Sequence, residues 1–247
     1  TPPTDSRGAR RHSAWLIAAA VALWVPSAFA QVMDTTLWVP NGYVHAVVRD
    51  GNTVYLGGDF TVVGPLTGAG VPVSAASGAI ARPFPKVDGS VLSVVPDGSG
   101  GWYIGGIFSA VGGASRLNLA HILADGTISD WDPSPTRTTN PEDSDGAEVY
   151  ALAVSGDRVY VGGSFTYIGG QYRPNLAAVD ATTGATTPWA PNAQSAISAL
   201  AVSGRTVYVR MWFEGRHRLA ALDATTGADA AWHADITGSV YALAVSG

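Results

Sequence analysis

Three arginines recur at equivalent places in the sequence and are its clearest candidates for ligand binding. Arg116, Arg173 and Arg216 each lie three residues before the leucine of a repeated apolar segment. A guanidinium donates forked hydrogen bonds to carboxylate and phosphate oxygens. Three of them on one face would hold a carboxylate, a phosphate or an acidic glycan. The structural alternative is that each arginine ties its own loop to a neighbouring carbonyl or carboxylate.

An acidic segment is the second candidate. Residues 140–148 read Asn-Pro-Glu-Asp-Ser-Asp-Gly-Ala-Glu, and carboxylates are oxygen ligands of the kind that calcium binds. The alternating ligand pattern of a calcium loop is missing, which favours a solvated acidic loop. Calcium binding by Glu142–Glu148 stays open, and no metal site is predicted.

Other catalytic patterns are missing from the sequence. The histidines at positions 45, 121, 217 and 233 show no His-x-His or His-Glu-x-x-His spacing. There is no Gly-x-Ser-x-Gly segment and no cysteine. The sequence therefore predicts no catalytic residue, no metal centre and no cofactor.

Charge and the N-terminus indicate the compartment. The 247 residues carry 14 Lys and Arg against 19 Asp and Glu, so nucleic acid is not an expected partner. Basic residues at 7–12, an apolar stretch at 14–25 and Ala28-Phe29-Ala30 predict a signal peptide over residues 1–30. Twelve apolar residues are too few to span a bilayer, although an uncleaved anchor or a buried helix is an alternative. We expect a secreted or cell-surface protein without a membrane span after cleavage, with the periplasm as an alternative.

The elements that must position these residues repeat along the chain. Val149-Tyr-Ala-Leu-Ala-Val-Ser-Gly156 returns at 197–204 and 240–247, with weaker copies starting at Val44 and Val91. The copies begin 43 to 58 residues apart, and each interval contains short β-type runs between turn residues. A unit of about 45 residues with four strands is typical of a β-propeller blade.

We therefore predict an all-β protein, a β-propeller built from four-stranded blades. A propeller domain is expected over residues 31–247, with complete blades at 43–89, 90–147, 148–195 and 196–238 and the start of another at 239–247. Residues 35–41 match 186–192 at five of seven positions, which predicts that the sequence opens on the last strand of a blade. We expect a fragment of a ring of five to eight blades.

Most repeated residues have a structural interpretation. Asp180 and Asp223 are predicted to form turns, and the tryptophans at 131, 189 and 232 are predicted to fill the gaps between blades. The glycine pairs at 57–58, 105–106 and 162–163 indicate close approach of a neighbouring sheet or ring. In the fourth blade Arg210-Met211 replaces this pair.

The segments Val-x-Ala-Leu-Ala-Val-Ser-Gly, Val-Tyr-Val-Gly-Gly-Ser-Phe and Leu-Ala-Ala-Val-Asp-Ala-Thr-Thr-Gly, together with Trp-Ala-Pro-Asn, resemble the delta-sixty repeat β-propellers of secreted bacterial proteins over residues 35–247. This resemblance implies export and a larger secreted or surface protein, and it supplies no catalytic residues. Residues 178–189 are also similar to the tryptophan docking motif of quinoprotein dehydrogenases. The gap before Trp189 is one residue longer and the adjacent-cysteine pair is absent, so no quinone is expected.

Three functions are compatible with the sequence. The leading hypothesis is a binding or scaffold module for an unknown protein or glycan ligand, because no catalytic motif is visible. The alternatives are a hydrolase or lactonase-like enzyme with a site at the mouth of the central channel and a purely structural surface repeat. Convergence of non-repeated polar residues at the channel mouth would favour a site there.

Overall fold

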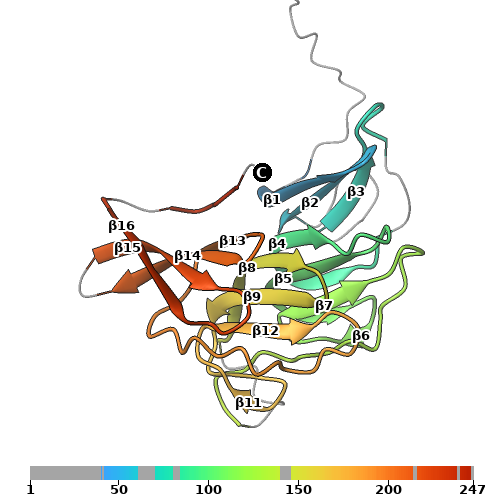
Figure 1. The fold of residues 1–247 in the computed structure, drawn as a ribbon. Coiled ribbons are helices and arrows are strands. Elements are labelled where there is room, and N and C mark those ends of the chain that lie inside the picture. Colours follow the sequence, from blue (N-terminus) through green and yellow to red (C-terminus); the bar gives the residue numbers. More distant parts are fainter. Residues whose placement is uncertain are drawn as a thin grey trace, which may run out of the picture. The chain divides into compact units, whose positions relative to one another are not determined.

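The computed structural model describes residues 40, 42–60, 70–79, 84–139, 146–213, 216–237 and 240–245. All regular elements within these ranges are β-strands (Figure 1), as the composition predicts. The expected signal peptide and the acidic residues 142, 143 and 145 lie outside the described residues. No helix in the described ranges is long and apolar enough to cross a membrane.

The strands form four consecutive antiparallel sheets, here called sheets 1 to 4, and a small hairpin of β10 (Tyr167–Ile168) with β11 (Gln171–Tyr172). The four sheets consist of the following strands: β1 (Tyr43–Asp50), β2 (Thr53–Asp59) and β3 (Gly70–Ser74); β4 (Val87–Pro96), β5 (Trp102–Val111), β6 (Ala114–Ser115) and β7 (Leu119–Ile122); β8 (Glu148–Ser155), β9 (Arg158–Ser164) and β12 (Leu176–Asp180); β13 (Ala199–Ser203), β14 (Thr206–Phe213), β15 (Arg216–Asp223) and β16 (Asp229–Ile236).

The fourth β run of each unit differs from the expectation in sheets 2 and 3. It is reduced there to single bridges, Ile122 to Ile128 and Val179 to Thr186, whereas β16 of sheet 4 is a full strand. In sheets 2 and 3 a proline, Pro133 or Pro191, follows two residues after the tryptophan. Proline has no amide donor for a strand ladder, and sheet 4 has no proline at this position.

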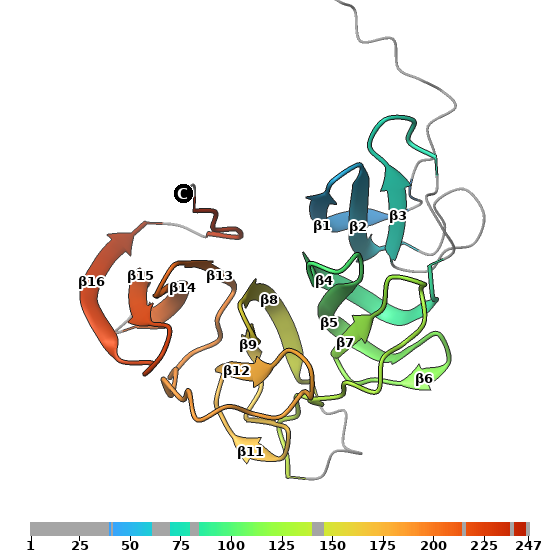
Figure 2. The same ribbon diagram turned by 45° about the vertical axis from the view of Figure 1, so that its right-hand side comes forward.

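Consecutive sheets share apolar cores. One core contains Tyr55 and Trp102, the next Tyr103 and Trp131, and the third Tyr160 and Trp189 with residues of sheet 4. The first strands lie next to one another along the series, since β4 contacts β1 and β8, and β8 contacts β13 (Figure 2). The series of first strands is therefore where residues from every sheet meet.

The first glycine of each pair explains this close packing. A Cβ atom on Gly57, Gly105 or Gly162 would lie 2.5–2.8 Å from the side chain of a valine or isoleucine on the first strand of the next sheet or just before it. Only a hydrogen fits there, so the glycine sets the distance between sheets, as the sequence predicts.

The second glycine has a different role, within its own sheet. A Cβ atom on Gly58 or Gly163 would overlap the carbonyl oxygen of Tyr43 or Glu148 on the first strand. At this place the register of the first strand slips by one residue, between Val44 and Ala46 in sheet 1 and at the corresponding places in sheets 2 and 3. The glycine thus makes room for a β-bulge, which inserts one unpaired residue.

Candidate functional site

One cavity of about 270 Å³ lies where the first strands meet. Its lining comes from the first strands of sheets 1 to 3, from the first strand of sheet 4 with the residue before it, and from the segment 241–243. The lining residues are His45, Ala46, Val47, Leu92, Ser93, Val94, Val95, Tyr150, Ala151, Leu152, Ser198, Ala199, Leu200, Tyr241, Ala242 and Leu243. Its size is near the lower end of the range for small-molecule pockets, which begins at roughly 300 Å³.

The bulges select which residues line this cavity. The unpaired residues at the three register shifts are His45, Leu92 and Tyr150, and all three are lining residues. Ser198 and Tyr241 occupy the same place in the other two copies of the repeat and also line the cavity. Bulges commonly re-aim a side chain next to a functional site.

The residue just before this position in each copy packs between sheets instead of lining the cavity. Val91, Val149 and Ile197 are fully buried and pack against the first glycine of the preceding sheet. The repeat therefore keeps a branched aliphatic residue where sheets pack. It changes residue type at the cavity, from histidine to leucine, tyrosine or serine.

A histidine and a carboxylate form a pair beside the cavity in sheet 1. His45 Nε2 lies 2.8 Å from Asp59 Oδ2, and both side chains are partly exposed. Hydrogen bonds from Ser90 and then from His45 hold the pKa of Asp59 below its ordinary value, against a smaller opposing effect of burial. Asp59 is therefore ionised at neutral pH and orients the imidazole ring.

Sheet 3 contributes a hydrogen-bonded tyrosine. The Tyr150 hydroxyl donates to Glu148 Oε2, which fixes its proton away from any ligand. The remaining lone pair of the phenolic oxygen is an acceptor site. This part of the lining is therefore suited to ligand hydroxyl groups.

Sheet 4 departs from the other sheets at the same place. Arg210 stands at the register of Gly57 and Gly162, opposite Ala199. Its Nη1 donates to Ser198 Oγ at 3.0 Å, and Nη2 contacts the His217 ring. Arg210 Nε is buried and has no hydrogen-bond partner in the described part of the chain. A permanent positive charge thus lies directly behind a cavity-lining hydroxyl.

The three predicted arginines lie on three different sheets. Arg116 donates to the carbonyls of Ser115 and Ser129 at 2.7 and 2.8 Å, and Arg173 donates to those of Tyr172 and Thr187. Arg216 is mostly exposed and lies 3.4 Å from Asp235. None of them lines the cavity of the first strands. These contacts are of the kind that the structural alternative describes, and ligand binding by the three arginines stays a prediction.

Each of the other three histidines contacts a charged side chain. His121 lies 3.0 Å from Asp97 and His233 lies 2.7 Å from Asp229, while His217 contacts Arg210. Within the described ranges no group of three or more His, Asp or Glu side chains is arranged to hold a metal ion.

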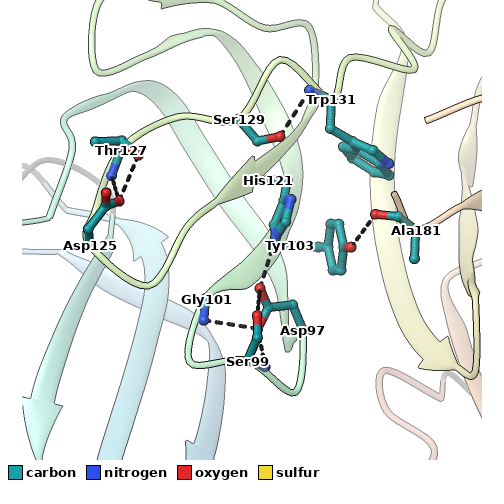
Figure 3. A network of polar contacts seen from close by, with 10 residues as sticks. All are labelled: Asp97, Ser99, Gly101, Tyr103, His121, Asp125, Thr127, Ser129, Trp131 and Ala181. Carbon is teal, nitrogen blue, oxygen red and sulfur yellow. Dashed lines mark hydrogen bonds and ion pairs between the residues drawn. The ribbon is translucent and has the colours of Figure 1, made fainter. Parts of the chain in front are cut away.

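Figure 3 shows the contact between sheets 2 and 3, which also contains His121. The Tyr103 hydroxyl donates to the carbonyl of Ala181 at 2.7 Å, and Trp131 Nε1 donates to the carbonyl of Asp180 at 2.8 Å. Burial, with the charges of Asp97 and Asp180, raises the pKa of Tyr103 to about 12. Tyr103 therefore remains a neutral donor at neutral pH, and this network joins two sheets.

The same arrangement recurs between sheets 3 and 4. Trp189 Nε1 donates to the carbonyl of Asp223 at 2.9 Å, and the Tyr160 hydroxyl donates to that of Ala224 at 3.0 Å. The carboxylates of Asp180 and Asp223 accept bonds from the amides and hydroxyls of their own turns. This confirms the prediction that the aspartates form turns and that Trp131 and Trp189 fill the gaps between blades.

The paired sheets and the docking tryptophans define a β-propeller. A family model described as a domain of unknown function, DUF5122, β-propeller, matches residues 96–128 and 157–177. These segments contain the second strands of sheets 2 and 3, where the Tyr-x-Gly-Gly-x-Phe repeats lie, with the further strands of sheet 2 and the start of β12. The prediction of an all-β propeller is thereby confirmed.

Solved structures with a related chain path are distant in sequence. The computationally designed Ika4 protein is 15% identical, with a TM-score of 0.47, over 72% of this chain and 91% of that chain. The Dos1 propeller is 14% identical, with a TM-score of 0.47, over 81% of this chain and 62% of that chain. No curated protein sequence matches the chain.

Proposed function

We propose that this chain is an exported propeller module of the delta-sixty repeat type, which binds a ligand in the cavity of the first strands. The observation that carries the proposal is the pattern of variation within the repeat. The position that packs between sheets keeps a branched aliphatic residue, whereas the next position, which lines the cavity, is a different residue in each of the four sheets and tyrosine again at 241. Packing accounts for the repeated residues, and it gives no reason for His45, Tyr150 and Ser198 to converge on one cavity.

The chemistry of the lining favours a small polar ligand over an apolar one. His45, Tyr150 and Ser198 provide hydrogen-bonding groups, and Val94, Leu152 and Leu200 provide apolar wall. Tyr241, with 85% of its surface exposed, offers an aromatic face at the same cavity. A few placed polar groups on an apolar wall are typical of sites that fix the orientation of a ligand. A glycan residue or a polar side chain of a protein ligand matches these groups.

Ligand binding is tested by screening the purified chain against a saccharide array and a peptide library. Ligands found in the screen are then titrated against variants. His45→Ala and Tyr241→Ala are expected to weaken binding about tenfold or more, since each removes a direct contact of about 1.4 kcal/mol. Tyr172→Ala is the matched control, because Tyr172 is also exposed but lies on the β10–β11 hairpin. A ligand whose affinity is unchanged in both cavity variants would refute the assignment of the cavity.

Export is tested by expressing the chain with residues 1–30 retained in a bacterial host. The expected result is protein outside the cytoplasm, with a measured mass that corresponds to a chain beginning at Gln31. Cytoplasmic protein that retains residues 1–30 would contradict this part of the proposal, and it would leave the cavity assignment unaffected.

A further inference from the structure

The cavity carries a directional hydrogen-bond pattern, which narrows the chemical class of its ligand. In sheet 4, Ser198 Oγ accepts the bond from Arg210 Nη1 at 3.0 Å. One lone pair of the hydroxyl is therefore occupied, and its proton must point to another acceptor. The acceptor in the described structure is the carbonyl oxygen of Val240, 3.4 Å from Ser198 Oγ. This distance is long for a hydrogen bond from a hydroxyl group. Ser198 is thus poised to donate to an acceptor on a ligand in the cavity.

The charge behind Ser198 favours an anionic acceptor. No carboxylate among the described residues lies within ion-pair distance of Arg210. Its Nε also remains buried without a hydrogen-bond partner in those ranges. A guanidinium keeps its charge at all physiological pH values, and a hydrogen bond to a charged acceptor is stronger than one to a neutral acceptor.

The neighbouring strand shows the opposite preference. Tyr150 donates its own proton to Glu148, so it presents an acceptor to the cavity beside a negative charge. A ligand carboxylate would be repelled at this place, whereas a hydroxyl would be accepted. The lining therefore favours a ligand that places an anionic acceptor at Ser198 and a hydroxyl donor at Tyr150.

We infer that the ligand of this cavity is a hydroxylated carboxylate, of which a uronic acid residue is the representative class. Its carboxylate lies at Ser198, in front of the Arg210 guanidinium, and its ring hydroxyls lie toward Tyr150. The exposed ring of Tyr241 faces the apolar side of the sugar. This inference rests on the proposed function and adds an acid group to the ligand.

Isothermal titration of the full chain with D-galacturonate and with D-galactose tests the inference, because the two sugars differ by the carboxylate. Galacturonate is expected to bind about tenfold tighter, which corresponds to one charge-assisted hydrogen bond. Arg210→Gln and Ser198→Ala are each expected to remove this advantage, and Ser198→Thr, which keeps the hydroxyl, is expected to retain it. Arg216→Gln is the control, since this arginine of the same sheet is exposed and pairs with Asp235.

The outcomes separate the two proposals. Equal affinity for the two sugars, with both lost in Tyr241→Ala, would overturn the preference for an acid and leave the cavity as the binding site. An acid preference that survives in both Arg210→Gln and Ser198→Ala would also overturn the assignment. If galacturonate does not bind at all, the inference is wrong, and the array screen then decides the proposed function independently.

Discussion

The tryptophans of sheets 3 and 4 give a sharp test of how the sheets are held together. Trp189 is only 2% exposed, donates to the carbonyl of Asp223 and meets Tyr160 edge to face. Trp232 is the equivalent residue of sheet 4, but 47% of its surface is exposed. An aromatic side chain of this size buries about 200 Å², which at about 25 cal/mol per Å² corresponds to about 5 kcal/mol. Burial of half that area corresponds to about 2.5 kcal/mol.

We therefore expect Trp189→Ala to lower the free energy of unfolding by about 3–5 kcal/mol and Trp232→Ala by about 2.5 kcal/mol or less. The measurement is urea unfolding followed by far-ultraviolet circular dichroism, which does not depend on the tryptophan that is removed. The midpoint is compared at an unchanged slope with urea. Equal losses in the two variants would refute the reasoning, because the difference in burial would then have no energetic consequence.

Three further results are expected in the same unfolding assay. Gly162→Ala places a Cβ atom 2.8 Å from Ile197 and is expected to cost about 1–3 kcal/mol of stability; a neutral result would show that the sheets are not held at this distance. Asn175 has φ = 63° and donates from Nδ2 to the carbonyl of Ala193 at 2.9 Å, so Asn175→Gly is expected to cost about 1 kcal/mol and Asn175→Ala about 2 kcal/mol. The opposite order would contradict the role of the backbone conformation. Burial opposes ionisation of Asp97, but the bond from His121 and those from its own turn hold its pKa below the ordinary value. The stabilisation is therefore complete above the unfolded pKa of about 4 and is lost as pH falls through the lower folded value. Asp97→Asn should flatten the acid limb of the stability profile, and an unchanged limb would refute this assignment.

Turn and docking residues were predictable because their chemistry is local. An aspartate followed three residues later by threonine and then by glycine forms its turn from neighbouring groups, as Asp180 and Asp223 do. A tryptophan at a fixed distance from that turn, repeated in three units, predicts the same contact between neighbouring units. Trp131 and Trp189 make this contact.

The ligand-binding candidates could not be found in the same way. Equivalent arginines drew attention because they recur, yet Arg116 and Arg173 bond to carbonyls of their own sheets. The cavity is lined partly by recurring alanines and leucines, and its polar groups come from the variable second position of each Val-x-Ala-Leu-Ala-Val-Ser-Gly copy. Repetition marks packing, so a site is better sought where an otherwise constant repeat changes.

The sequence by itself determined the repeating unit, its all-β character and its turns, because these depend on spacing and on neighbours along the chain. The tertiary structure decided which side chains face the cavity. The side chain of a bulged residue is aimed by a slip in strand register, and that slip depends on a glycine of the next strand. Gly163 provides it for Tyr150. In sheet 4, Met211 stands in place of this glycine, and the first strand begins at Ala199, after the position of the bulge. The charge of Arg210 at Ser198 follows from the same departure, since a side chain occupies a place that the other sheets keep empty for packing.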